Sequence, residues 1–205
     1  MQAYTPGESD AIAPPDHRAS FVQQMRAVPG AVAIICSAAN GHRTGLAATA
    51  WNSLCADPPM LLVCVNRNAS AHALIREAEA FSVNLLSTAD SETVGIFSGQ
   101  CGLAGGDRFV QGEWDEGDSG QPLFNRAVAA FECDLEAAHS YGTHDIFIGK
   151  VNHIRSGSAG SPLIFLNGTF CQPVPLEHHA SGASANPNTH REMCDSDGPK
   201  DQVND

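Results

Sequence analysis

This chain of 205 residues lacks closely spaced cysteine pairs, a dinucleotide-binding glycine motif and long apolar runs. Its seven cysteines are never spaced as CxxC, so we interpret them as buried free thiols and not as a disulfide or zinc framework. No GxGxxG follows a candidate strand, which argues against a Rossmann domain. No apolar run approaches the roughly 20 residues that span a bilayer. The polar, acidic start does not resemble a secretory signal, so we expect a protein of the reducing cytoplasm.

Positive charge is also scarce. Eleven basic residues stand against 23 acidic ones, which gives a formal net charge of −12. A chain this acidic is not expected to bind nucleic acid or an acidic membrane surface. Up to residue 173, every basic residue except Lys150 is an arginine, a side chain suited to bidentate contacts with phosphate or carboxylate.

Composition divides the chain into three parts. Residues 1–15 are polar and contain proline, so we expect a disordered leader. Ser, Asn, Pro, Gly and Asp dominate from 174 to 205, where few apolar side chains remain to offset the entropy of ordering. We therefore expect one folded domain over 16–173, followed by a disordered acidic tail over 174–205.

Short apolar runs separated by turn residues predict a mostly β domain. Helices are expected over 16–25, where Asp16 is the N-cap, over 70–78 and over 91–97. Asn40-Gly41 and Asn167-Gly168 predict tight hairpin turns. Strands are predicted over 31–37, 43–54, 60–65, 80–86, 127–138, 143–154, 163–166 and 169–171. This pattern favours a closed antiparallel barrel over a parallel α/β sheet.

Residues 47–59 alternate small side chains with hydroxyls. The run reads Ala-Ala-Thr-Ala-Trp-Asn-Ser-Leu-Cys-Ala-Asp-Pro-Pro. Small residues let a ligand approach the backbone, and Thr49 and Ser53 offer hydrogen bonds. A flavin ring edge and its ribityl chain require this combination of amides and hydroxyls. The alternative is simply a tightly packed strand.

Residues 64–70 lie where a predicted strand gives way to a helix. Ser70 or Asn68 is the expected N-cap, and a helix N-terminus attracts phosphate through its free amides and its dipole. Arg67 would add positive charge. The alternative is ordinary capping with an arginine that faces solvent.

Two later clusters carry candidate charged groups. Gly106-Asp107-Arg108-Phe109 places a guanidinium on a glycine-rich loop, and Gly142-Thr143-His144 places an imidazole where a strand begins. We expect this strand to bury the face that carries Ile146, Ile148 and Val151. The two clusters together are typical of a site for an anionic, planar ligand, although a histidine here can also be an ordinary surface residue. The chain's histidines and cysteines lack a zinc-site spacing, so no metal is expected.

Five motifs in order resemble the flavin reductase family, which supplies reduced flavin to partner monooxygenases. They cover roughly 20–172 and comprise the runs 45–67 and 81–86, Phe97-Ser98, Asp107-Arg108-Phe109, and the strand of His144. The resemblance implies an FMN-binding split β-barrel, a Greek-key antiparallel barrel with few helices. It also implies a homodimer with flavin near the subunit interface.

The resemblance implies a role for each matching residue. The flavin ring and ribityl chain would contact Ala47, Ala48, Thr49, Ala50, Trp51, Ser53 and Leu54. The phosphate end would contact Asn66, Asn68, Ala69 and Ser70. Phe97 and Ser98 would close the other side of the ring, Arg108 would steady flavin or NADH phosphates, and His144 would lie beside the nicotinamide as the catalytic residue. Trp51 replaces a smaller apolar residue of the family, so it would either stack on the ring or narrow the site.

The function implied is an NAD(P)H:flavin oxidoreductase that passes a hydride from NADH to FMN or FAD. The reduced flavin would then reach a separate monooxygenase component. The scarcity of lysine slightly favours NADH over NADPH, whereas the choice between FMN and FAD stays open. The alternatives are a split-barrel reductase that keeps its flavin and reduces another acceptor, and a flavin-binding module without catalytic activity.

Overall fold

The computed structural model describes residues 16–109, 114–157 and 160–176. Contacts between residues divide the chain into two units, one that ends at Pro173 and one that begins at Val174. The expected leader over 1–15 and most of the expected tail, from 177 to 205, lie outside the described residues. No helix in the described ranges is both long and apolar enough to cross a membrane.

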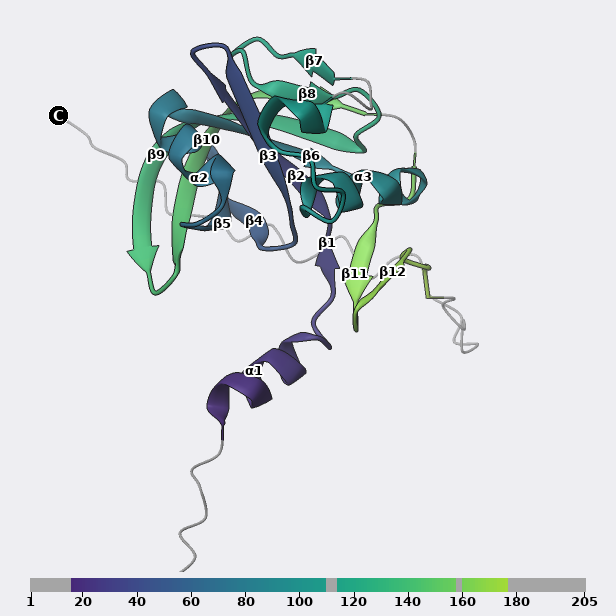
Figure 1. Ribbon diagram of the computed structural model, residues 1–205. Coiled ribbons are helices and arrows are strands. Elements are labelled where there is room, and N and C mark those ends of the chain that lie inside the picture. Colours follow the sequence, from purple (N-terminus) through teal and green to yellow (C-terminus); the bar gives the residue numbers. More distant parts are fainter. Residues whose placement is uncertain (1–15, 110–113, 158–159, 177–205) are drawn as a thin grey trace, which may run out of the picture. The chain divides into compact units, whose positions relative to one another are not determined.

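Strands dominate the described chain, as the short apolar runs predict (Figure 1). The helical segments are α1 (His17–Met25), α2 (Ser70–Ala78), α3 (Ser91–Phe97) and the 3-10 turns η1 (Thr88–Asp90) and η2 (Gly105–Phe109). The strands are β1 (Gly30–Ala31), β2 (Ala33–Ala39), β3 (His42–Ala48), β4 (Trp51–Ala56), β5 (Pro59–Asn66), β6 (Ala80–Leu85), β7 (Trp114–Glu116), β8 (Pro122–Phe124), β9 (Ala129–Tyr141), β10 (His144–Ser156), β11 (Ile164–Leu166) and β12 (Thr169–Cys171).

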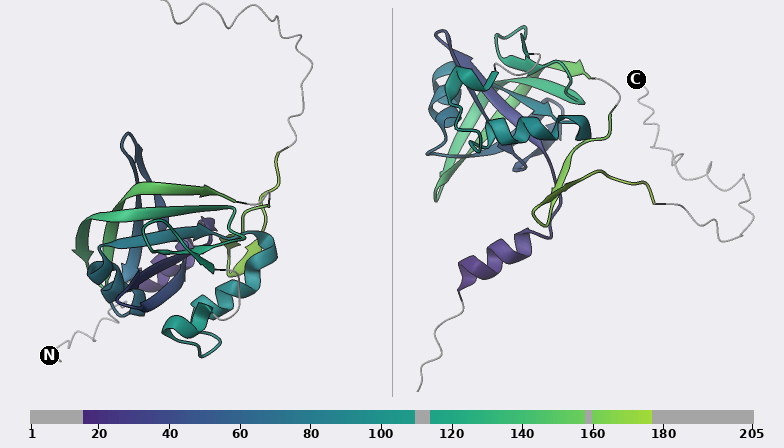
Figure 2. Two further views of the ribbon diagram at one scale, coloured as in Figure 1. Left: turned by 90° about the horizontal axis from the view of Figure 1, so that it is seen from above. Right: turned by 45° about the vertical axis from the view of Figure 1, so that its right-hand side comes forward.

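A seven-stranded antiparallel sheet forms the body, in the order β3-β2-β6-β9-β10-β5-β4. Its longest hairpin, β9 with β10, is visible in both views of Figure 2. Two smaller antiparallel sheets, β1-β11-β12 and β7-β8, complete the described strands. The prediction of a mostly β, antiparallel fold with few helices is therefore confirmed.

The predicted tight turns and the first helix cap are present. Asn40 and Gly41 adopt positive φ angles of 51° and 77° and pair Ala39 with His42 across the β2–β3 hairpin. Asparagine and glycine tolerate this left-handed conformation better than other residues do. The Asp16 carboxylate accepts hydrogen bonds from the Arg18 and Ala19 amides and so caps α1.

One prediction about strands was wrong, and one pair of strands was missed. The run 43–54 is not one strand, because β3 ends at Ala48 and the chain turns through Thr49 and Ala50 into β4. Cys64 N donates to Ala50 O at 2.8 Å, which ties this turn to β5. The short pair β7–β8 was not predicted, since three-residue strands are too short to show a periodic pattern and no Asn-Gly turn marks this pair, as Asn167-Gly168 marks β11 and β12.

Strand β10 buries the face opposite to the one expected from its isoleucines. Asp145 is 1% exposed and Phe147 is fully buried, whereas Ile146 and Ile148 are only half-buried. Pairing sets Phe147 opposite Val63 and Asp145 opposite Val65, both of which are core residues of β5. Side chains alternate along a strand, so this register turns both isoleucines outward.

The cysteines follow the prediction only in part. Cys36 and Cys133 are buried, and burial raises the pKa of both thiols, that of Cys133 to about 12. Cys55 and Cys101 are exposed, contrary to expectation. All six cysteines within the described ranges are free thiols.

Candidate functional site

The run 47–54, named here the small-residue edge, follows the end of β3 through a turn into β4. Ala47 and Ala48 are half-buried at the end of β3, and Thr49 and Ala50 are exposed in the turn. On β4, Ser53 and Leu54 are exposed. The small-residue edge thus presents small side chains and hydroxyls at the surface.

Trp51 is held within the fold. Its indole Nε1 donates to Ala31 O at 2.9 Å, and its ring packs against the core cluster that contains Val63. This contact connects β4 to the strand β1 and accounts for a large side chain at this position. The expected contact between Trp51 and the flavin ring stays a prediction.

The start of α2 lacks the side-chain cap that the sequence predicts. The N-cap is Ala69, and neither Asn68 nor Ser70 caps the helix. Asn66 Oδ1 instead accepts from Asn68 N at 2.9 Å, and the Ser70 and Thr44 hydroxyls lie 2.9 Å apart. The first amides of α2 therefore have no side-chain acceptor in the described chain, an arrangement that favours an anion.

Strand pairing brings His144 directly opposite Asn66, although 78 positions separate them in the sequence. Arg67 N donates to Thr143 O at 3.0 Å, and the Arg67 guanidinium donates to Gly142 O. The segment before α2 is thus tied to the β9–β10 turn. His144 is exposed, and its Nδ1 lies 2.9 Å from the Thr143 hydroxyl, which orients the ring.

Phe97 and Arg108 both meet β3 at Gly45. Phe97 is 2% exposed and packs against Phe109 and Trp114. It therefore supports β3 from within the core, whereas the sequence predicted that it would face a ligand. A Cβ at Gly45 would lie 2.9 Å from the Phe97 ring. Ser98, at the end of α3, is exposed.

Two donor groups of Arg108 are used inside the fold. Its Nε donates to Leu103 O at 3.0 Å, and its Nη1 donates to Gly45 O at 2.5 Å. Arg108 therefore fastens η2 to β3. Its expected contact with a phosphate stays a prediction.

A buried carboxylate beside His144 was not anticipated. Asp145 Oδ2 accepts from Arg76 Nη2 at 2.5 Å and lies 2.9 Å from His72 Nε2, so it joins β10 to α2. These hydrogen bonds, that of Arg76 first, hold the pKa of Asp145 well below its usual range. The period-two pattern that places Asp145 on the face of Phe147 is the sequence signal that was overlooked.

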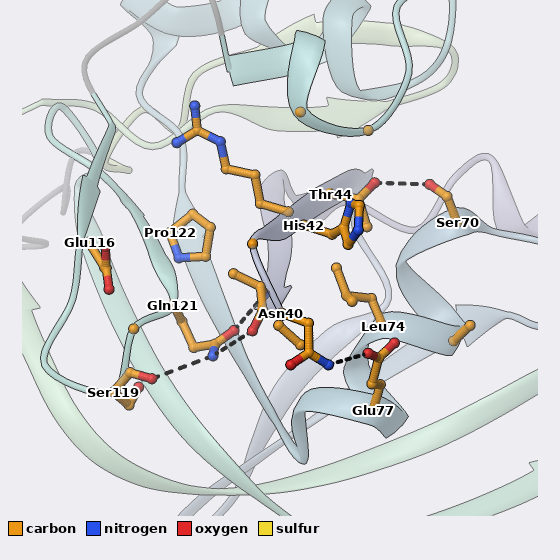
Figure 3. Close-up of a pocket in the computed structure, with 18 of the residues that line it drawn as sticks. Asn40, His42, Thr44, Ser70, Leu74, Glu77, Glu116, Ser119, Gln121 and Pro122 are labelled. Carbon is orange, nitrogen blue, oxygen red and sulfur yellow. Dashed lines mark hydrogen bonds between the residues drawn. The ribbon is translucent and has the colours of Figure 1, made fainter.

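A cavity of about 800 Å³ lies between the β2–β3 hairpin, α2, η2 and the β7–β8 pair, and we call it the hairpin cavity (Figure 3). Figure 3 shows Leu74 and Glu77 of α2 on one side, Ser119 and Gln121 on the other, and Asn40 and His42 between them. Ser70 is the one residue that the hairpin cavity shares with the residues predicted from sequence. The sequence did not predict the cavity itself, because its walls come from segments as far as about 80 residues apart.

These groups can perform three tasks in the folded chain. The small-residue edge can accept a flat ligand, the start of α2 can bind an anion, and His144 can form hydrogen bonds or exchange a proton. The described ranges contain no group of three or more His, Cys, Asp or Glu residues arranged to hold a metal ion.

Comparison with known proteins assigns the chain to a family. The sequence model described as "Flavin reductase like domain" matches residues 25–173, most of the chain. The chain belongs to the flavin reductase-like domain family. The resemblance carried by the five motifs is therefore confirmed.

Several relatives of this flavin reductase-like protein carry functional names. It is 32% identical over 153 residues to the FMN reductase (NADH) RutF of Stutzerimonas stutzeri, covering 75% of this chain and 87% of the relative. It is 34% identical over 166 residues to the reductase component of an FADH(2)-dependent resorcinol hydroxylase of Rhizobium sp., covering 80% and 92%. Among solved structures, the NADH:FAD oxidoreductase SgcE6 of Streptomyces globisporus, in complex with NAD and FAD fragments, matches with a TM-score of 0.71 and 26% identity. That match covers 79% of this chain and 96% of the other.

Proposed function

We propose that this flavin reductase-like protein transfers a hydride from NADH, or NADPH, to FMN or FAD. The observation that carries the proposal is the pairing of Asn66 with His144 beside the uncapped start of α2. This pairing brings a candidate phosphate site and a candidate nicotinamide partner to one end of the sheet. Relatives named FMN reductase (NADH) and hydroxylase reductase component support the same activity.

Flavin is proposed to bind along the small-residue edge, with its phosphate end at residues 66–70. Flavin supplies the hydride acceptor, and the protein stacks and orients it against the nicotinamide. The exposure of Thr49 and Ala50 supports this placement, as does the absence of a side-chain cap at the start of α2. Ser98 is proposed to border the ring, and Phe97 and Arg108 to position β3 beneath it.

His144 is proposed to hydrogen-bond the nicotinamide carboxamide. The contact between its Nδ1 and the Thr143 hydroxyl orients the imidazole. Because one ring nitrogen is engaged in this way, Nε2 is the atom offered to the ligand. This role is one of positioning and stabilisation, since the hydride passes directly between the two cofactors.

The sheet is proposed to close as a Greek-key split β-barrel. Its edge strands β3 and β4 are joined by only Thr49 and Ala50, and Leu46 of β3 and Trp51 of β4 pack against one core cluster. Side chains from both edges reaching the same core support a sheet that curls upon itself. The folded domain is proposed to span 16–173, with the segments 1–15 and 174–205 outside it.

A homodimer is proposed because an apolar sheet face lies half-exposed. Ile146 pairs with Cys64 and Ile148 with Leu62, and all four side chains are turned away from the core. Leu54 of the neighbouring strand is 46% exposed. A second copy would cover this face and complete a flavin site near the interface.

A separate monooxygenase is proposed to take up the reduced flavin. The cytoplasm, which holds NADH, is the proposed compartment.

The test of the proposed activity is to measure oxidation of NADH and of NADPH with FMN, FAD and riboflavin supplied in turn. We expect oxidation only when flavin is added. Tight flavin retention with turnover of another acceptor would favour the flavin-retaining alternative, and no binding of any flavin would refute the proposal.

A further inference from the structure

We propose that Asp145, together with Arg76 and His72, holds the start of α2 against the flavin phosphate and is therefore a positioning residue of the flavin site. This inference rests on the proposed function, because it concerns the phosphate end that is proposed to bind at residues 66–70. Asp145 follows His144 on β10, and consecutive side chains of a strand point to opposite faces. His144 is exposed, whereas Asp145 is 1% exposed and turns toward α2.

One face of α2 supplies both partners of this carboxylate. His72 and Arg76 are four positions apart, so they lie one turn apart on the same face of the helix. Arg76 Nη2 donates to Asp145 Oδ2 at 2.5 Å, and His72 Nε2 lies 2.9 Å from the same oxygen. Both side chains also lie against Phe147, the next inward residue of β10. The His72 ring centroid is 5.3 Å from that of Phe147, and the guanidinium carbon of Arg76 is 5.6 Å from it.

A hydrogen-bonded carboxylate fixes a helix in a way that apolar packing does not. The apolar residues Ala71, Leu74 and Ile75 are buried and attach α2 to the sheet. Apolar contacts depend on buried area and not on direction, so they tolerate small shifts of the helix. A buried ion pair adds little net stability over an apolar pair, but its hydrogen bonds are satisfied in one geometry only. The network therefore determines where α2 lies along β10, in addition to its effect on stability.

The turn of α2 that is fixed in this way begins at the proposed phosphate site. His72 is the third residue of the helix, two positions after Ser70. Before the helix, Arg67 N donates to Thr143 O at 3.0 Å. The segment 66–70 is thus attached to the β9–β10 turn on one side and, through the first turn of α2, to β10 on the other. Because hydrogen bonds require both the correct distance and the correct angle, a shift of α2 would weaken its contact with a phosphate.

Riboflavin and FMN separate this role from a purely structural one, because they differ only in the phosphate. We would titrate the unmodified protein and the variant Asp145→Asn with each flavin by fluorescence, after circular dichroism has shown that the variant is folded. The unmodified protein should bind FMN about tenfold more tightly than riboflavin. Asp145→Asn should lower the affinity for FMN by about fivefold and leave that for riboflavin unchanged. In steady-state assays the KM for FMN should rise while kcat at saturating FMN is retained, because Asp145 contacts no reacting atom.

Asp90→Asn is the matched control. Asp90 is 3% exposed and, like Asp145, accepts a hydrogen bond from an arginine, Arg126 Nε at 2.8 Å. It belongs to η1, and Arg126 follows β8, so the substitution should destabilise the fold without moving α2. The ratio of FMN affinity to riboflavin affinity should therefore be preserved in Asp90→Asn.

Arg76→Gln tests whether the carboxylate and the guanidinium act as one unit. It should cause the same loss of FMN affinity as Asp145→Asn, and the double variant should lose no more than either single variant. Additive losses would overturn the inference, because Arg76 would then contact the phosphate itself. Should Asp145→Asn fail to fold, His72→Ala takes its place, since it removes only one of the two contacts of the carboxylate. The same selective loss of FMN affinity is expected.

Three further results would each overturn the inference alone. They are equal affinities of the unmodified protein for FMN and riboflavin, a loss in Asp145→Asn that falls on both flavins alike, and a loss of FMN preference that Asp90→Asn reproduces. In each case, oxidation of NADH on addition of flavin would still support the proposed function. Failure of the unmodified protein to bind either flavin would refute the proposed function as well.

Discussion

The small-residue edge and the hairpin cavity differ in what presents their polar groups. Along the edge, the proposed flavin would meet backbone amides and the hydroxyls of Thr49 and Ser53, mostly on exposed residues. Around the cavity, the walls are joined by side chains that reach across the fold, such as Gln121 to Ala38 and Asn40 to Glu77. Substitutions at the edge should therefore change binding directly. Substitutions behind the cavity should change stability first and binding as a consequence.

Glu132→Ala should have the largest effect and should act on the cavity side alone. Glu132 is 1% exposed, and its carboxylate accepts from the Asp118 and Ser119 amides at 3.0 Å. It therefore anchors the β7–β8 loop, which forms one cavity wall. Loss of a buried, charged acceptor that serves several donors should lower the free energy of unfolding by about 3 kcal/mol. Urea unfolding measures this change.

Glu136→Ala on the same strand is the control, because Glu136 is exposed. It should change stability by no more than about 0.5 kcal/mol. Equal effects of the two substitutions would show that the loop anchor does not stabilise the cavity wall.

Asp145→Asn should remove an acid-sensitive connection between α2 and β10. Hydrogen bonds from Arg76 and His72 lower the pKa of Asp145, so its contribution to stability is present above the unfolded pKa of about 3.9 and is lost as the pH falls further. The Tm of the unmodified protein should exceed that of the variant by roughly 5 °C near neutral pH. This difference should shrink as the pH falls below about 4, toward the lowered pKa of the folded state.

Thermal melts over this pH range provide the measurement, and Asp107→Asn, at an exposed position, is the control. A gap between Asp145→Asn and the unmodified protein that stays constant with pH would contradict the assignment. The small-residue edge does not depend on this titration except through the placement of α2.

His144→Ala should reduce kcat/KM for NADH by about tenfold while leaving FMN affinity unchanged, because the ring is proposed to contact only the nicotinamide. Steady-state kinetics and a flavin titration together test this split. His153→Ala, on the same strand, removes a histidine whose partner is the exposed Asp118, and it should have little effect. Unaltered kinetics in His144→Ala would remove this residue from the site.

Thr44→Val should have the smallest effect, at the boundary between the two regions. Thr44 is 4% exposed, and valine keeps its shape while removing the hydroxyl contact with Ser70. We expect a loss of about 1 kcal/mol in stability and roughly a threefold loss in affinity for FMN and FAD alike. Unchanged affinity for both flavins would show that the contact between Thr44 and Ser70 does not support flavin binding.

Local signals in the sequence predicted local structure well. Asn40-Gly41 and Asn167-Gly168 mark real turns because few other residues tolerate their φ angles. Asp16 caps α1 because its carboxylate reaches amides only two and three positions away. The order of motifs was enough to identify the family, since it depends on residue identity and not on packing.

Predictions that depended on non-local contacts were less successful. The isoleucines of β10 favoured one buried face, yet pairing with β5 buried Asp145 and Phe147, and Arg76 and His72 compensate the carboxylate. Phe97 was expected beside a ligand, but contacts with Phe109 and Trp114 place it in the core. In both cases the deciding partner lies on a segment distant in the chain.

Amino-acid order alone thus specified the two Asn-Gly turns and most strands, because each depends on neighbours a few positions apart, and the order of the motifs specified the family. The buried face of β10, the proximity of Asn66 to His144 and the hairpin cavity arose only on folding. Pairing register and side-chain packing join segments that are tens of residues apart, and no local pattern encodes which of them will meet.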